Sequence, residues 1–244
     1  MTQTPTNNHP ATSGRTTSRA AGGSRKGGRT VHFYVLLDRS GSMESMRSDV
    51  IGGYNNFLRE QRQEHGRARI TLVQFDSQDP QETLLDAAPI SGASDLTADT
   101  FVPRGGTPLL DATASLVERA RGRRSTRRAL GRREEEIVFV TVTDGEENQS
   151  TRYTLEHVRR LVEAGRAEGW NFVYLGAGLD AYGDAARLGY DPASTQAWKA
   201  DGEGAQAMWG SVSRAAAQLR RDVAAGVAFN KAEYFRGVKE AEES

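Results

Sequence analysis

The chain has 244 residues, with 32 lysine and arginine side chains and 32 aspartate and glutamate side chains, so its formal net charge is zero. A neutral chain has no overall field that attracts nucleic acid, and nucleic acid is therefore not expected as its partner. Cysteine is absent, which excludes disulfides and thiolate metal sites and is compatible with a reducing cytoplasm.

Apolar segments are short throughout the chain. The best of them, residues 33–37 and 137–142, have the length of strands and not of membrane spans. The first 30 residues lack the apolar core of a secretory signal. We expect a soluble cytoplasmic protein without membrane association.

Basic residues are concentrated in two places. Residues 1–29 contain five lysines and arginines and no acid in a background rich in Gly, Ser and Thr, which predicts a disordered basic tail. Residues 119–133 contain eight arginines, and we interpret this run as a solvated loop. An electrostatic contact with an acidic partner or nucleic acid is the alternative for both, although no aromatic residue interleaves either run.

Strands and helices are predicted to alternate along the rest of the chain. Apolar or β-branched runs predict strands, and apolar residues spaced by three and four predict helices. The expected strands are 31–37, 69–75, 81–87, 136–143, 171–176 and 195–199. The expected helices are 45–65, 109–121, 154–168, 181–188 and 204–224.

This order predicts an α/β fold. We expect a doubly wound, mostly parallel, Rossmann-like central sheet with helices on both faces and one short antiparallel edge strand at 81–87. The folded domain is assigned to residues 30–225, and residues 226–244 are assigned to a C-terminal tail of undetermined order.

Oxygen-bearing side chains lie in three segments next to these predicted elements. Asp38, Ser40 and Ser42 come directly after the first strand, at spacings of two that direct them to one side. Thr107 lies in a Gly-Gly-Thr-Pro loop before a helix, and Asp144 ends the strand EIVFVTVT. Ligands of open α/β sheets bind beyond the carboxyl ends of the strands, so we expect these residues to meet there.

Two carboxylates and three hydroxyls form a set of hard oxygen ligands, which suits Mg²⁺ or Mn²⁺ better than a calcium cage of many carboxylates. Each residue also has a local interpretation. Ser42 or Ser45 would cap the following helix, and Asp144-Gly145 would be a simple turn.

The pattern Asp38-x-Ser40-x-Ser42, then Thr107, then Asp144-Gly145 resembles the metal-ion-dependent adhesion site of von Willebrand factor type A domains. The resemblance covers roughly residues 31–220 and implies that Ser40, Ser42 and Thr107 reach the metal through their hydroxyls. It implies that Asp38 and Asp144 act mainly through water or as acceptors behind the metal-bound groups. Mg²⁺ is the expected ion, with Mn²⁺ or Ca²⁺ as alternatives.

Neutral hydroxyl ligands leave a cation electrophilic, and a carboxylate from another protein would then complete its coordination. The expected function is a metal-dependent protein-binding module whose partner presents a Glu or Asp carboxylate. The resemblance further implies an adaptor or regulatory subunit that works with an ATPase or a multiprotein complex.

Two other functions remain open. One is a Mg²⁺-dependent phosphoryl-transfer or hydrolytic enzyme that uses Asp38, although position 40 is Ser instead of a second Asp and no phosphate-binding Gly-x-x-x-x-Gly-Lys motif occurs. None of the four histidines is placed as a general base, so we expect no enzyme. The other is an interaction protein that works through its basic tail and arginine run.

Overall fold

The computed structural model describes residues 1–2, 29–145, 147–177 and 180–227. Its regular elements run from Thr30 to Ala225. The expectations for the two tails fall largely on residues 3–28 and 228–244, which lie outside the described residues.

A six-stranded sheet forms the centre of the molecule, with strand order β3-β2-β1-β4-β5-β6. All neighbouring strands are parallel except β3, which is antiparallel to β2 at one edge. The predicted fold class is therefore confirmed. The strands are β1 (Thr30–Asp38), β2 (Ala68–Phe75), β3 (Glu82–Pro89), β4 (Glu135–Thr143), β5 (Asn171–Gly176) and β6 (Thr195–Ala197).

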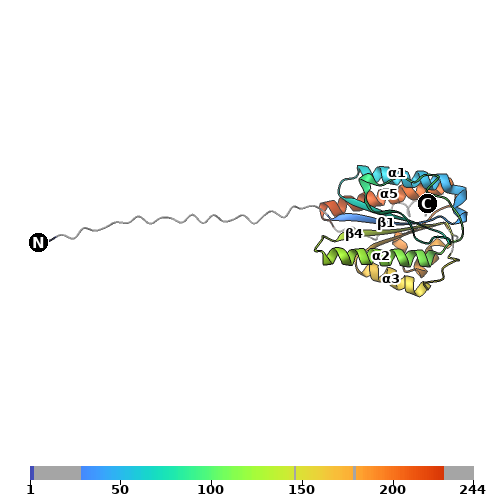
Figure 1. Ribbon diagram of the computed structural model, residues 1–244. Helices are drawn as coiled ribbons and strands as arrows, with labels where there is room; N and C mark the ends of the chain where they lie inside the picture. The colour runs from blue at the N-terminus through green and yellow to red at the C-terminus, as the bar shows by residue number, and fades with distance from the viewer. Residues whose placement is uncertain (3–28, 146, 178–179, 228–244) are drawn as a thin grey trace.

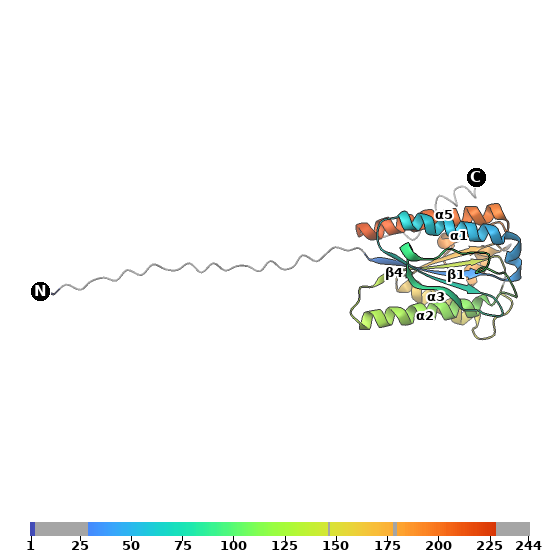
Figure 2. The ribbon, with the colours of Figure 1, turned by 45° about the horizontal axis from the view of Figure 1, so that its top comes forward.

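Helices cover both faces of this sheet (Figure 1). On one face lie α1 (Arg47–Gln63) and α5 (Gly202–Ala225), which run side by side in both views (Figure 2). On the other face lie α2 (Leu109–Ala129), α3 (Leu155–Ala167) and the short α4 (Ala181–Arg187). Three 3₁₀ helices complete the described elements, at Gly41–Met46, Ile90–Gly92 and Pro192–Ser194.

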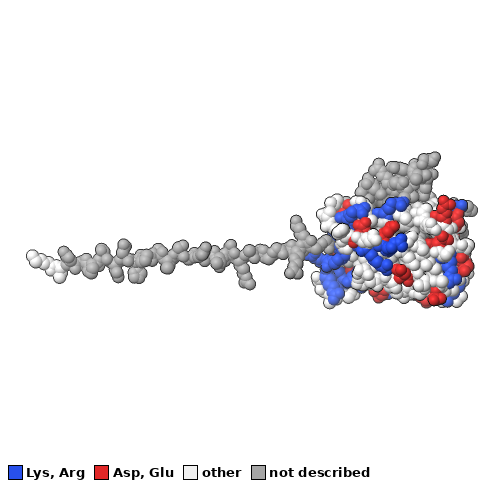
Figure 3. All heavy atoms as spheres, turned by 90° about the horizontal axis from the view of Figure 1, so that it is seen from above, with Lys and Arg blue, Asp and Glu red and all other residues white. Residues whose placement is uncertain are grey.

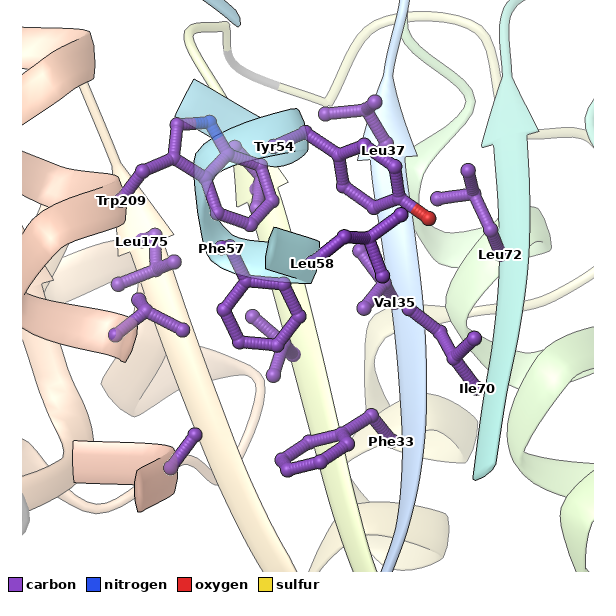
Figure 4. Close-up of a cluster of buried hydrophobic side chains, with 14 of the residues drawn as sticks. Phe33, Val35, Leu37, Tyr54, Phe57, Leu58, Ile70, Leu72, Leu175 and Trp209 are labelled. Carbon is purple, nitrogen blue, oxygen red and sulfur yellow. The ribbon is translucent and has the colours of Figure 1, made fainter. Parts of the chain in front are cut away.

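The alternation of side chains along each strand divides the apolar core into two layers. Phe33, Val35 and Leu37 of β1 face α1 and α5, where they meet Phe57 of α1 and Trp209 of α5 (Figure 4). Tyr34 and Leu36 face α2 and α3 on the other side. Because both faces are covered, β1 is buried along almost its whole length.

The interpretation of residues 119–133 as a loop is wrong. Helix α2 continues to Ala129 and includes six of the eight arginines, and only Arg132 and Arg133 follow it. Carboxylates from other elements neutralise this part of the helix. For example, Arg119 pairs with Asp86 of β3 at 3.0 Å, and Arg124 pairs with Glu168 after α3 at 2.6 Å. Arginine also has a high helix propensity, so the paired run is stable as helix.

Candidate metal centre

The predicted site residues come from three segments at the carboxyl end of the sheet. Asp38 is the last residue of β1, and Asp144 directly follows β4. Leu37 pairs with Val142 in the parallel ladder of these two strands, which brings both carboxylates to one edge. Thr107 lies two residues before the start of α2.

A chain of hydrogen bonds joins the serines to Asp144. The hydroxyl oxygens of Ser40 and Ser42 lie 3.0 Å apart, and Ser42 donates to Asp144 Oδ1 at 2.9 Å. Thr107 is brought to the same place by Gly145, since a Cβ atom added there would lie 3.3 Å from Thr107 Oγ1 and 3.9 Å from Ser42 Oγ. A residue without a side chain thus lets the Thr107 loop approach the β4 loop closely.

The local alternatives for the serines are not observed. Neither the 3₁₀ helix Gly41–Met46 nor α1 has a side-chain hydrogen bond at its N-cap, and these N-caps are Ser40 and Met46. Ser42 instead donates its hydroxyl proton across the molecule to Asp144. Its side chain therefore takes part in a long-range contact between β1 and β4 segments.

Asp38 is fully buried, and both of its carboxylate oxygens accept hydrogen bonds. Oδ1 accepts from the backbone N–H of Ser40 at 2.7 Å, and Oδ2 accepts from the Thr143 hydroxyl at 2.6 Å. Burial raises the pKa of the Asp38 carboxyl from 3.8 to about 7, and the nearby charge of Asp144 adds to this rise. Burial also raises the pKa of Asp144. Positive charge between the two carboxylates would favour their ionised forms.

These donors fit a hard divalent cation and no softer metal. Within the described part of the chain, no group of three or more His, Asp or Glu side chains is arranged to hold a metal. The site instead combines two carboxylates with the hydroxyls of Ser40, Ser42 and Thr107. Oxygen donors of this kind suit Mg²⁺, which binds through few carboxylates and retains water. Ser42 is exposed, so the cluster is open to solvent on its side.

An ionic network that the sequence analysis missed fixes the segment after β1. Arg39 is buried and pairs with Asp76 at 2.6 Å and with Glu82, and Arg104 pairs with Asp76 at 3.0 Å. Hydrogen bonds from backbone N–H groups and from both arginines lower the pKa of Asp76, although its burial acts in the opposite direction. This network joins the Asp38–Ser42 segment to the loop that carries Thr107. Spacing in the sequence gives no signal for it.

The backbone reinforces the same junction. Gly41 donates to the carbonyl of Gly105 at 3.1 Å, and Arg104 donates to the carbonyl of Arg39 at 2.8 Å. Gly105 has a φ of 67°, a conformation that favours glycine. The glycine-rich loop is therefore shaped for this close approach.

Two further carboxylates hold the loop after β4. Glu147 accepts a hydrogen bond from the backbone N–H of Leu110 at 2.8 Å, in the first turn of α2. Asp111 of α2 accepts from the backbone N–H groups of Thr151, Arg152 and Tyr153. Glu146, next to Glu147, lies outside the described residues. The sequence suggests these contacts only through Asp111, an acidic residue in the first turn of α2.

The described histidines have other contacts. His32 is buried near the start of β1 and binds Glu135 at 3.1 Å and Thr71 at 2.9 Å. His157 of α3 lies 3.5 Å from Glu118, and His65 is exposed beyond the end of α1. His9 lies outside the described residues. No described histidine is hydrogen-bonded to a residue of the candidate site.

Comparisons with known proteins find similarity at the level of the fold alone. No protein-family model matches the chain, and no curated protein matches it. The pilus adhesin SpaC of Lactobacillus rhamnosus GG superposes with a TM-score of 0.54 and 14% identity, over 79% of this chain and 30% of the adhesin. Proximal thread matrix protein 1 of the mussel byssus gives 0.52 and 16% identity, over 81% of this chain and 48% of that protein.

Manganese-loaded TRAP protein of Plasmodium vivax superposes with a TM-score of 0.48 and 17% identity, over 74% of this chain and 72% of that chain. This chain spans less than half of the adhesin and of the byssus protein. The molecule has an α/β fold like that of von Willebrand factor type A domains. None of its described helices is long and apolar enough to cross a membrane.

Proposed function

We propose that the chain is a metal-dependent protein-binding module. The observation that carries the proposal is the convergence of Ser40, Ser42 and Asp144 in one hydrogen-bonded chain, with Asp38 and Thr107 beside it. Ser40, Ser42 and Thr107 would hold Mg²⁺ through their hydroxyls, with Asp38 and Asp144 supplying the negative charge. When bound, the ion supplies an electrophilic centre for an incoming carboxylate.

The partner would present a Glu or Asp side chain. Neutral hydroxyls leave most of the cation's charge uncompensated, so an anionic group gains more there than water does. An adaptor or regulatory subunit of a cytoplasmic complex, with an ATPase as one candidate partner, fits this chemistry. The likeness to type A domains supports the interaction role at the level of the fold.

Binding is favoured over catalysis because, among the described residues, no histidine contacts the cluster and no nucleophile other than Asp38 suggests itself. Asp38 is the alternative nucleophile, yet its side chain is fully buried and both oxygens already accept hydrogen bonds. A phosphorylated Asp38 would have to break these contacts. We therefore propose that the chain is not an enzyme and that phosphate esters show no turnover above metal-only controls.

Partner capture in Mg²⁺ and in EDTA tests the proposal. The wild-type chain should retain an acidic partner in Mg²⁺ and release it in EDTA, and Asp38→Ala should lose it in both. Asp99→Ala, which removes an exposed carboxylate, is the matched control and should behave as the wild type does.

Deletion of residues 1–29 separates this function from one that works through the basic tail. The metal-bridge proposal expects capture by the deleted chain to remain sensitive to EDTA. Capture that is lost on deletion and indifferent to EDTA would contradict it.

A further inference from the structure

An open cleft of about 530 Å³ lies at the end of the sheet opposite the candidate metal centre. Thr30, Ala68 and Glu135, the first residues of β1, β2 and β4, line it. It is separated from Asp38 by the length of β1, roughly 26 Å at the usual rise per strand residue. Eight of the 17 described residues that line the cleft are arginines, and three are glutamates. Lysine and arginine side chains are also prominent on the surface toward this end, at the left in Figure 3.

The three glutamates are already engaged by cations outside the lining. Glu64 pairs with Arg221 at 3.0 Å, and Glu134 lies 3.5 Å from Arg124. Glu135 is almost completely buried, binds His32 at 3.1 Å and lies 3.5 Å from Arg123. Carboxylates also pair with four of the lining arginines: Arg69 and Arg127 contact Glu135, Arg29 contacts Glu136 and Arg62 contacts Asp95. The lining still carries an excess of positive charge, because its eight arginines outnumber its three glutamates.

Backbone carbonyls hold several of these arginines in place. The buried Arg220 donates to the backbone carbonyls of Glu64 and Gly66, each at 2.8 Å. Arg69 donates to the carbonyl of Ala87 at 2.8 Å, and Arg127 donates to the carbonyl of Arg133 at 2.9 Å. Backbone contacts position the guanidinium groups before any ligand arrives, which lowers the entropic cost of binding an anion.

The size and the charge of the cleft indicate the ligand. A cleft of about 530 Å³ has the volume of a small-molecule site, whereas a protein partner is bound over a much larger surface. Linked phosphate groups concentrate several negative charges in such a volume, and the guanidinium fork binds phosphate in a bidentate manner. None of the described lining residues is aromatic, so a nucleobase has nothing on which to stack.

We propose that this arginine cleft binds a compact anion of linked phosphate groups, such as an inorganic polyphosphate, through its phosphate oxygens alone. The site is independent of the metal centre and gives the arginine-rich segment a function. Arg127, Arg132 and Arg133, which line the cleft, all come from that segment.

Calorimetric titration with sodium tripolyphosphate in EDTA tests this proposal without involving the metal centre. The full chain should bind at low salt, with affinity that falls as salt rises. Arg67→Gln/Arg132→Gln removes two exposed arginines of the cleft, and we expect a loss of about tenfold in affinity for each arginine. Arg160→Gln/Arg214→Gln removes the same charge from exposed sites on α3 and α5 outside the lining and should change affinity less than about twofold.

Competing ligands show which kind of phosphate compound the cleft binds. ATP should bind about as tightly as tripolyphosphate, because its base makes no contribution, and AMP should bind much more weakly. Equal losses in the two double variants, or no binding of tripolyphosphate, would overturn the proposal. Tighter binding of a poly-glutamate peptide would replace it with an acidic protein partner, and tighter binding of a single-stranded oligonucleotide of matched charge would replace it with a nucleic acid. The Asp38→Ala variant should bind tripolyphosphate as the wild type does. The metal-site proposal and the cleft proposal can therefore fail independently of each other.

Discussion

At the scale of single residues, Asp38 has the most unusual environment in the candidate site. Its carboxylate is buried beside Asp144, and two hydrogen bonds offset only part of the cost of that burial. In the absence of metal, the folded state therefore holds a proton on Asp38 up to a pH of about 7, whereas the unfolded chain releases it near 3.8. The contribution of this group to the free energy of unfolding falls as pH rises through that interval.

Metal binding should show the opposite pH dependence, because the cation requires the ionised carboxylate. Below a pH of about 7 the metal competes with a proton on Asp38, and the apparent Mg²⁺ affinity should fall by about tenfold per pH unit. The measurement is the rise in Tm caused by saturating Mg²⁺, which we expect to be large at pH 8 and small at pH 6. Metal-free samples at both pH values control for other titrating groups such as His32. An equal Mg²⁺ effect at the two pH values would contradict this account.

The sequence predicted which residues meet at this edge, but not what holds them in place. Asp38, Ser40 and Ser42 follow a recognisable strand, and Asp144 ends another, so strand order alone brings them to one edge. Arg39 and Glu147 carry no comparable signal, because their partners lie 37 residues away in both cases, at Asp76 and Leu110. Contacts of this kind depend on how the loops pack at the edge of the sheet.

At the scale of elements, the C-terminal half of α2 shows why a run of like charges does not by itself predict a loop. Repulsion among the arginines is offset by three carboxylates: Asp86 of β3, Glu134 directly before β4 and Glu168 directly after α3. The sequence predicted the start of this helix correctly at Leu109, where apolar periodicity is clear. It did not predict the end, because the stabilising acids are distant in the chain.

A glycine of α1 allows the close approach of Trp209 of α5. Gly53 of α1 lies directly against Trp209 of α5, which packs on the core residues shown in Figure 4. A Cβ atom at position 53 would overlap the Trp209 ring, whereas one at the exposed Gly52 meets nothing within 4 Å. Two adjacent glycines of one helix thus differ in their packing alone.

Gly53→Ala should therefore lower the free energy of unfolding by about 1–3 kcal/mol, because overpacking outweighs the gain in helix propensity. Gly52→Ala, the matched control, should raise it by about 1 kcal/mol through helix propensity. Urea denaturation followed by circular dichroism measures both changes. Stabilisation by both substitutions would show that α5 is not packed against α1 in solution as described.

At the scale of the whole molecule, the two ends of the sheet differ in chemistry. Carboxylates and hydroxyls gather where the parallel strands end, and arginines gather where they begin. A net charge of zero conceals this polarity, which explains why composition alone predicted no electrostatic partner. The layered α/β architecture was predictable from strand and helix periodicity, whereas the arginine cleft required the three-dimensional convergence of β1, β2, α1, α2 and α5.

The central claim is that Asp38, Ser40, Ser42, Thr107 and Asp144 bind a divalent cation, and calorimetric titration of Mg²⁺ into the purified chain tests it most directly. We predict saturable binding by the wild type and by Asp99→Ala, and no measurable binding by Asp38→Ala that retains its circular dichroism spectrum. Folded Asp38→Ala that binds Mg²⁺ with wild-type affinity would contradict the account.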